Sequence, residues 1–279
     1  MIDRIGFIQG RLSPMVNNKI QAFPWDHWRH EFLISSELNI RLIEWTLDQD
    51  RLYENPLMNQ DGQAEIRNLC NSYGIKIPSL TGDCFMQAPF WKNAGAARRE
   101  LEKDFLAITK SCSEIGISIL VVPLVDNGRL GSDLEEDELI NFMKSQENFF
   151  LLNKIKIAFE SDYTPIKLGR FIKRLNSNVF GVNYDIGNSA ALGFDPMEEF
   201  DEYGKRIVNV HIKDRLLDGT TVALGLGNAK FEVVFAELAR YNYKGNYILQ
   251  TARATEEQHA KVLSVYRNQV ITWHQNHAS

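Results

Sequence analysis

Eight short apolar runs, spaced along the whole chain and each followed by an amphipathic segment, most constrain how this sequence can fold. The runs occupy residues 5–9, 40–45, 75–80, 117–124, 156–160, 179–185, 207–212 and 247–251. They are rich in Val, Ile and Phe, a composition typical of strands that are buried on both faces of a parallel sheet. The helix-like segments between them occupy residues 26–38, 62–73, 96–115, 133–152, 166–175, 196–204, 229–241 and 255–275.

This alternation predicts the α/β class and, more narrowly, a single (β/α)8 TIM barrel over residues 1–279. The alternative is a doubly wound open sheet, which commonly carries a glycine-rich dinucleotide loop after its first strand. Residues 9–12 read Gln-Gly-Arg-Leu, which is not such a loop. One barrel accounts for the length of 279 residues, and no Pro-, Gly- or Ser-rich linker marks a domain boundary.

Charge and cysteine content exclude several function classes. The chain has 31 Lys and Arg against 36 Asp and Glu, a net charge of -5, which argues against a nucleic-acid partner bound through phosphate neutralisation. Cys70, Cys84 and Cys112 are too few and too scattered for a disulfide framework or a zinc ribbon. No apolar stretch approaches the ~18 residues of a membrane span, and no signal-peptide pattern is present. We therefore expect a cytoplasmic protein without a membrane or nucleic-acid partner.

Polar residues stand at the ends of the last four apolar runs. They are Glu160, Asp185, His211 and Gln250. Active sites of (β/α)8 barrels lie at the carboxyl ends of the strands, so these four side chains are expected to converge. Two carboxylates, an imidazole and an amide oxygen suit a divalent cation such as Mn²⁺, Mg²⁺, Co²⁺ or Zn²⁺. The alternative is that they are hydrogen-bonded polar residues at strand ends with no ligand. Glu44, Asp83 and Asp126 follow earlier runs in the same way.

Four motifs accompany these strand ends in order: Phe159-Glu160, Tyr184-Asp185-Ile186-Gly187-Asn188, Val210-His211-Ile212-Lys213-Asp214 and Gly225-Leu226-Gly227. Together they resemble the sugar-phosphate isomerase/epimerase superfamily of xylose-isomerase-like TIM barrels, which also contains AP endonucleases, ketose 3-epimerases and inosose dehydratases. The resemblance covers nearly the whole chain, and residues 185–214 are its most specific part. It implies a divalent metal held by Glu, Asp, His and Glu at the ends of strands five to eight.

Two positions depart from the pattern that the resemblance implies. Glu160, Asp185 and His211 match the first three ligands, whereas Gln250 stands where the family commonly has glutamate. In the 3-epimerases the two glutamates also form the acid/base pair, and an amide cannot exchange a proton near neutral pH. Asn188 stands where many relatives have histidine. Endonuclease relatives bind several metals through many histidines, and of the six histidines here only His211 lies at an expected strand end.

The resemblance implies a metal-dependent isomerase or epimerase of a sugar or sugar phosphate, which removes a proton next to a carbonyl and forms an enediolate. Glu160 is the expected base, and Gln250 occupies the position of the opposing acid. Reprotonation by Glu160 itself would give an aldose–ketose isomerisation, while Lys213 or a bound water are other proton donors. A sugar lyase or dehydratase of the same fold, or a non-catalytic sugar-binding barrel, are the alternatives.

Further residues are expected to contact the substrate at the same mouth. They are Arg11, Glu44, Asn188, Lys213, Arg215 and Arg253. The segment Gly225–Asn228 opens a helix, so its free N–H groups could receive an anion, although an ordinary tight turn explains it equally well. These features favour a phosphorylated or acidic sugar, and a neutral sugar stays open.

Aromatic residues suggest how the pocket could be enclosed. The segment Phe23-Pro24-Trp25 is either a hydrophobic lid or a packed loop. Phe85, Phe90 and Trp91 are either a second pocket wall or the interface of a homodimer, since relatives in this superfamily often dimerise.

Overall fold

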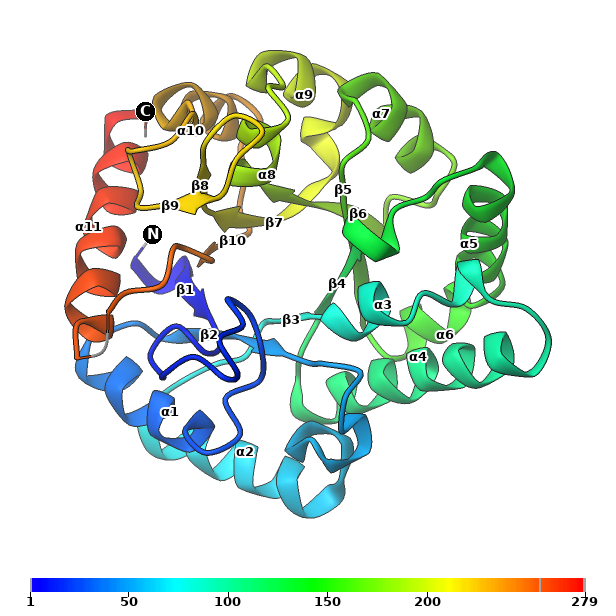
Figure 1. Ribbon diagram of the computed structural model, residues 1–279, viewed down its shortest axis with the longest axis horizontal. Coiled ribbons are helices and arrows are strands. Elements are labelled where there is room, and N and C mark those ends of the chain that lie inside the picture. Colours follow the sequence, from blue (N-terminus) through cyan, green and yellow to red (C-terminus); the bar gives the residue numbers. More distant parts are fainter. Residues whose placement is uncertain (1, 256, 278–279) are drawn as a thin grey trace.

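Eight parallel strands close into a barrel in the computed structural model, which describes residues 2–255 and 257–277. The strands are β1 (Ile5–Ile8), β2 (Leu42–Thr46), β3 (Ser79–Thr81), β4 (Ile119–Leu124), β5 (Lys156–Ser161), β6 (Phe180–Asp185), β7 (Ile207–Ile212) and β10 (Asn246–Leu249). Around the barrel each strand pairs with its neighbour in the sequence, and β10 closes the ring against β1. Figure 1 shows this barrel end-on, with the helices outside it. The predicted α/β class and TIM barrel are confirmed.

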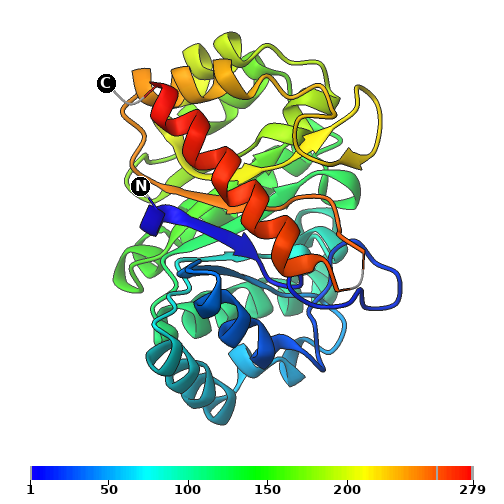
Figure 2. The ribbon, with the colours of Figure 1, turned by 90° about the vertical axis from the view of Figure 1, so that its left-hand side faces the viewer.

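The helices form the outer layer of the molecule. The longer ones are α1 (Trp28–Glu37), α2 (Gln60–Tyr73), α4 (Gly95–Ile115), α5 (Asp133–Ser145), α7 (Pro165–Lys173), α9 (Pro196–Tyr203), α10 (Phe231–Arg240) and α11 (His259–His277). Side-chain caps define several starts: the Ser132 hydroxyl accepts the Glu135 N–H at α5, and Pro165 opens α7. Helix α11 runs obliquely across the outside of β1 and packs on α10 (Figure 2). No helix within the described residues has the length and apolar character of a membrane span.

Three of the expected element boundaries differ from those in the structure. The third strand begins at Ser79 rather than at residue 75, since Pro78 has no N–H to donate to a ladder. The segment 133–152 is not one helix but two, because the backbone leaves helical geometry at Gln146 before α6 (Glu147–Leu152). The segment 255–275 is helical only from His259, and its residue 256 lies outside the described residues.

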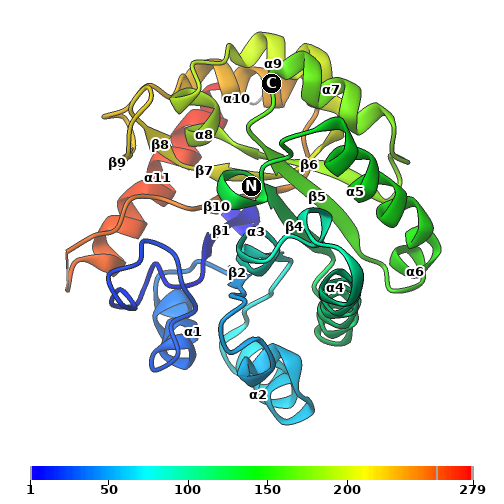
Figure 3. The ribbon, with the colours of Figure 1, turned by 45° about the vertical axis from the view of Figure 1, so that its right-hand side comes forward.

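Three small elements at the carboxyl ends of the strands were not predicted. Helix α3 (Asp83–Gln87) follows β3, and α8 (Ile186–Ala191) follows β6. The hairpin of β8 (Asp214–Arg215) and β9 (Thr221–Val222) follows β7. All three surround the same end of the barrel, beside the first loop (Figures 1 and 3). They are too short to show a hydrophobic period, so the sequence pattern could not separate them from loops.

Strand register brings polar residues to one level inside the barrel. Asp185 on β6 lies directly opposite His211 on β7, and Glu44 on β2 lies opposite Ile8 on β1. The layer between strands and helices is apolar and rich in aromatic side chains; Phe159 and Phe171 meet edge-to-face at 5.1 Å, for example. This packed outer layer fixes the strands, and the strands in turn fix the polar side chains inside the barrel.

Candidate functional site

A cavity of about 490 Å³ opens at the carboxyl ends of the strands, between α3, α8 and the β8–β9 hairpin. Its charged lining residues are Arg11, Lys19, Asp83, Asp126, Glu160, Lys213 and Arg215. Of the predicted site residues, the cavity brings together Arg11, Glu160, Asn188, Lys213, Arg215 and Gln250. Because barrel enzymes place their chemistry at this end, the cavity is the candidate functional site.

Glu160, Asp185 and His211 form a buried cluster at this cavity. One ligand atom from each residue lies within 4.8 Å of the other two. His211 Nδ1 is 3.3 Å from Glu160 Oε2 and 3.9 Å from Asp185 Oδ2. The other Asp185 oxygen caps α8 by accepting the Asn188 N–H, so the turn after β6 leaves Oδ2 facing the cluster. Three of the four predicted metal ligands therefore meet, and carboxylate oxygens with an imidazole nitrogen suit a divalent cation.

Glu44 lies on the opposite side of His211, inside the barrel. Its Oε1 is 2.7 Å from His211 Nε2. Its carboxylate also accepts hydrogen bonds from Ser79 Oγ at 2.6 Å, Thr81 Oγ1 at 2.5 Å and Asn209 Nδ2 at 2.9 Å. The prediction that Glu44 contacts substrate is wrong, because its side chain is fully buried and all these donors come from the protein. Glu44 instead engages Nε2 and leaves Nδ1 directed at the other carboxylates, as partners of metal-binding histidines do.

Charges in the cluster shift the pKa values of its members. Burial lowers the pKa of His211, but Glu44 and Glu160 outweigh burial and raise it well above its ordinary value. Burial raises the pKa of Glu44 and of Glu160, yet the charge and hydrogen bonds of His211 hold both pKa values below the ordinary one. Burial raises the pKa of Asp185, and the Lys213 ammonium offsets it only in part. The imidazole therefore carries a proton that a cation must displace.

Two asparagines orient the Glu160 carboxylate. Asn183 Nδ2 donates to Oε2, and Asn188 Nδ2 donates to Oε1, each at 2.7 Å. The Asn183 amide also lies 3.1 Å from His211 Nδ1. Asn188 was predicted as a substrate contact and does line the cavity, whereas Asn183 was not predicted. The signal that could have found it is its position two residues before Asp185, since alternate residues of a strand face the same side.

The Lys213 ammonium lies among three polar side chains of the cavity. Nζ is 3.2 Å from Asp185 Oδ2, 3.1 Å from Asn188 Oδ1 and 3.5 Å from Gln250 Oε1. Its aliphatic stem passes so close to Gly187 that a Cβ there would come within 2.6 Å of Lys213 Cγ. Gly187 therefore admits the lysine to the site. The ammonium supplies one positive charge beside the carboxylates of Asp185 and Glu160. It also contacts the Gln250 amide, which stands where the resemblance implies a glutamate.

The three predicted arginines have different roles. Arg215 lines the cavity and donates to Asn188 Oδ1 at 2.9 Å. Arg11 also lines the cavity, but its Nε donates to the Thr251 carbonyl at 2.8 Å, and burial lowers its pKa to about 9. Arg253 is not part of the cavity lining and donates to the carbonyls of Gly10 and Ser13. The prediction of Arg253 as a substrate contact is therefore corrected: it fastens the first loop.

The backbone N–H groups of the glycine-rich segment after β7 bind the side-chain carboxylate of Asp214. The N–H groups of Gly225 and Gly227 donate to Asp214 Oδ2 at 2.8 and 2.9 Å, and that of Ala229 donates to Oδ1 at 3.1 Å. Asp214 is fully buried. The alternative of a tight turn is therefore the better description, and these N–H groups are not free for a substrate phosphate.

Two acidic cavity residues lay outside the predicted set. Asp83 and Asp126 both line the cavity, and each was noted only as following a strand. Burial, together with the negative charges of Asp48 and Glu160, raises the pKa of Asp83 to about 8. A carboxyl group with this pKa is protonated at neutral pH and can donate a hydrogen bond into the cavity.

The aromatic residues of the first and third loops are packed in the interior. Phe23 is fully buried and contacts Trp45 with ring centroids 5.4 Å apart, so the packed-loop alternative describes it better than a lid. Phe85, Phe90 and Trp91 are also buried, and the Trp91 Nε1–H donates to the Gly128 carbonyl at 3.1 Å. They are neither a cavity wall nor an exposed interface, which corrects both alternatives.

Comparison with known proteins identifies the family. The sequence profile of the family described as xylose isomerase-like TIM barrel matches residues 32–269. The chain belongs to this family. No curated protein sequence gives a significant match.

Several solved structures share the fold over nearly the whole chain. A xylose isomerase domain protein from Planctomyces limnophilus has a TM-score of 0.76 and 15% identity, with 99% of this chain and 98% of that chain covered. A 3-keto-D-glucoside 4-epimerase from E. coli has a TM-score of 0.69 and 16% identity, with coverage of 98% and 99%. A mannonate dehydratase from Streptococcus suis has a TM-score of 0.70 and 12% identity, with coverage of 98% and 93%. At these identities the likeness establishes the fold, and activity has to be argued from the site.

Proposed function

We propose that this protein is a metal-dependent isomerase or epimerase of a sugar or sugar phosphate. The reaction is removal of a proton from the carbon next to a carbonyl, with an enediolate intermediate. The observation that carries the proposal is the meeting of Glu160, Asp185 and His211 at the cavity, with the far nitrogen of His211 held by Glu44. Epimerase and isomerase-domain relatives share the fold.

The residues present fit a divalent cation. Glu160, Asp185 and His211 would hold it, with the Gln250 amide oxygen as a fourth donor. Two buried carboxylates are costly to keep side by side unless positive charge compensates them. His211 lies 3.3 Å from Glu160 and the Lys213 ammonium lies 3.2 Å from Asp185, and a bound cation would take over the charge of the imidazole proton. When bound, such a cation stabilises the negative charge that develops on the substrate oxygens.

Glu160 is the proposed base. It lines the cavity, its pKa is held below the ordinary value by His211 against the effect of burial, and it is therefore a carboxylate at neutral pH. The amides of Asn183 and Asn188 fix the plane of the carboxylate and leave it facing the substrate space. A base fixed in this way loses little rotational freedom when the substrate arrives.

The group that returns the proton, and the carbon that receives it, decide whether the reaction is an isomerisation or an epimerisation. Gln250 cannot exchange a proton, so return by Glu160 to the neighbouring carbon gives an aldose–ketose isomerisation. Lys213 Nζ lies 3.5 Å from Gln250 Oε1 and lines the cavity, so it can deliver a proton from the side on which the epimerases have their second glutamate. We favour an acidic or phosphorylated sugar, because Lys213, Arg215 and Arg11 border the cavity.

A dehydratase is the second candidate, and one observation favours it. Loss of a hydroxyl group as water needs an acid at the leaving oxygen, and the site offers an ammonium rather than a carboxylate beside position 250. The mannonate dehydratase from Streptococcus suis shares the fold.

A solvent-isotope screen tests the proposal. Ketoses, aldoses and their phosphates are incubated with the protein in D2O, and deuterium at each carbon is measured by NMR together with the bound-metal content. Deuterium uptake at the carbon next to the carbonyl is expected for the native protein and for Glu114→Gln, an exposed control on α4, and not for Glu160→Gln. Elimination products would identify the dehydratase. A protein that binds no divalent ion and labels no sugar contradicts the proposal.

A further inference from the structure

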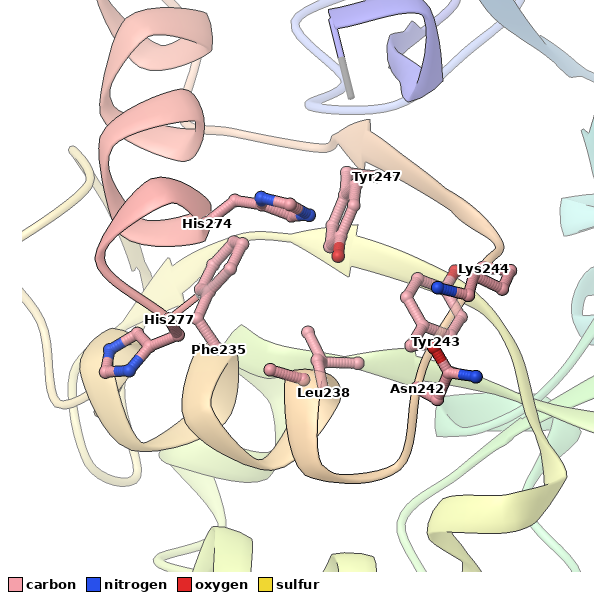
Figure 4. Close-up of a pocket in the computed structure, with 9 residues that line it drawn as sticks. Phe235, Leu238, Asn242, Tyr243, Lys244, Tyr247, His274 and His277 are labelled. Atoms are coloured by element: carbon pink, nitrogen blue, oxygen red, sulfur yellow. The ribbon is translucent and has the colours of Figure 1, made fainter. Parts of the chain in front are cut away.

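A second cavity lies at the opposite end of the barrel from the candidate functional site. Its volume is about 180 Å³, and it is bordered by α10, by the turn leading into β10 and by the last turns of α11 (Figure 4). Phe235 and Leu238 form an apolar wall, and Tyr247, Lys244 and His274 supply polar atoms. The cavity is smaller than the roughly 300–1,000 Å³ of pockets for drug-sized ligands, so it suits a small ligand or one group of a larger one.

Positive charge gathers at this cavity. The Arg4 guanidinium lies over the Tyr247 ring, with Cζ 5.2 Å from the centroid, and its Nη2 donates to the Tyr247 hydroxyl at 3.2 Å. The Arg4 Nε is buried without a hydrogen-bond partner. The side chains of Lys244 and Tyr247 extend toward the space between His274 and Leu238 (Figure 4). Within residues 2–255 and 257–277, neither Arg4 nor Lys244 forms an ion pair with a carboxylate.

Glu232, which contacts His277 at the edge of this cavity, already has two hydrogen-bond partners. Glu232 Oε2 is 2.7 Å from His277 Nε2 at the end of α11, and its Oε1 accepts from the Asn276 amide at 3.3 Å. The His274 ring, one turn earlier, faces the edge of Tyr247 instead, with ring centroids 6.1 Å apart. Burial and the charges of Arg4 and Lys244 lower the pKa of His274, so it is a neutral hydrogen-bonding group at neutral pH.

We propose that this second cavity binds a small oxyanion of the phosphate class, held by Lys244, His274 and the Tyr247 hydroxyl, with Arg4 behind the tyrosine. An anion would supply the negative charge that the cluster otherwise lacks, and each of the three groups can donate a hydrogen bond to it. The apolar wall of Phe235 and Leu238 admits a carbon skeleton next to the oxyanion, so free phosphate and a phosphate ester share the same chemistry here. The site is independent of the reaction proposed at the other end.

Phosphate titration at constant ionic strength tests this site. The imidazole resonances of ¹⁵N-labelled His274 are followed by NMR while inorganic phosphate is added, with NaCl adjusted to exclude a general salt effect. A saturable shift is expected for the native protein. Lys244→Gln is expected to weaken the apparent affinity about five- to tenfold, the loss of one charge-assisted hydrogen bond. Lys244 is exposed, so this variant should fold, which circular dichroism verifies.

The controls separate this site from the mouth of the barrel and distinguish two sources of the anion. Lys110→Gln, an exposed lysine on α4, should leave the shift unchanged. Arg215→Gln should also leave it unchanged, because Arg215 lines the other cavity. Tighter binding of phenyl phosphate than of inorganic phosphate would identify a phosphate ester as the natural ligand, and equal or weaker binding would identify free phosphate. Absence of any saturable shift, or equal affinities in Lys244→Gln and Lys110→Gln, would overturn the proposal.

Discussion

Two buried glutamates flank His211, and they differ in what surrounds them. Glu44 contacts Nε2 from inside the barrel, is fully buried, and receives hydrogen bonds from a serine, a threonine and an asparagine. Glu160 approaches Nδ1 from the cavity side, is held by two asparagine amides, and is 7% exposed. Both pKa values lie below the ordinary one. Burial and a shifted pKa are thus common to both glutamates, and access to the cavity is the property that makes Glu160 the proposed base.

The largest expected effect is on kcat, and it comes from substituting Glu160, the glutamate on the cavity side of His211. Glu160→Gln keeps the shape of the side chain and removes the base, so kcat should fall by roughly 10²–10⁴, the usual contribution of a general base. The measurement is initial rate on whichever sugar shows deuterium exchange. Glu114→Gln is the matched control. Unchanged kcat in Glu160→Gln would assign the proton transfer to another group.

Glu44→Gln should act on metal affinity rather than directly on proton transfer. The amide cannot accept the His211 Nε2–H with the same strength, so divalent-metal affinity should fall about 10- to 100-fold, as for other partners of metal-binding histidines. Calorimetric titration with Mn²⁺ measures the affinity. At saturating metal, kcat should recover to a large part of the native value. Failure to recover would show that Glu44 acts on the chemical step as well.

Metal affinity should rise with pH. The pKa of His211 is raised well above its ordinary value by Glu44 and Glu160 against burial, so the imidazole is protonated at neutral pH and must lose a proton when the cation binds. Below that pKa, affinity should therefore increase by up to about tenfold per pH unit. Calorimetry in buffers of different ionisation enthalpy should count about one proton released per cation. Zero protons released would show that His211 is already neutral before the cation binds.

Gln250→Glu should have the smallest effect. A carboxylate at this position adds negative charge to the cavity, but the Lys213 ammonium, 3.5 Å from the Gln250 oxygen, neutralises much of it. We expect metal affinity to rise only about fivefold, the equivalent of ~1 kcal/mol. The double variant with Lys213→Met should show a larger gain. Equal gains in both backgrounds would indicate that Lys213 does not compensate position 250.

The sequence could predict the side chains that lie at strand ends on the cavity side, but not those that lie deeper inside the barrel. Glu160, Asp185 and His211 end apolar runs, and strand ends of a barrel converge whatever the details of packing. Asn183 and Asn209 lie inside such runs, where only the alternation of faces and the register between strands reveal that they point to the interior. Glu44 was placed at the correct strand end, but its burial depends on four donors from two other strands, β3 and β7.

Loops limited the prediction in a different way. Asp214 and the glycines at 225 and 227 are separated by a hairpin that has no hydrophobic period, so nothing in the sequence paired them. Arg253 could be placed only after the course of the first loop was known, because its partners are backbone carbonyls.

The Asp214 carboxylate holds the two ends of the loop after β7 together. This carboxylate closes the base of the β8–β9 hairpin through three backbone N–H groups, while the residues on either side, Lys213 and Arg215, line the cavity of the candidate functional site. The tip at residues 216–220 lies beyond this closure. Within the tip, the Gly219 carbonyl accepts hydrogen bonds from Arg215 Nε at 3.1 Å and from Nη2 at 2.8 Å. Replacing the tip should therefore move the Arg215 guanidinium, while Asp214 keeps the base of the hairpin closed. The length of the tip thus sets where one of the two cations stands, which makes the hairpin a place to alter ligand selectivity.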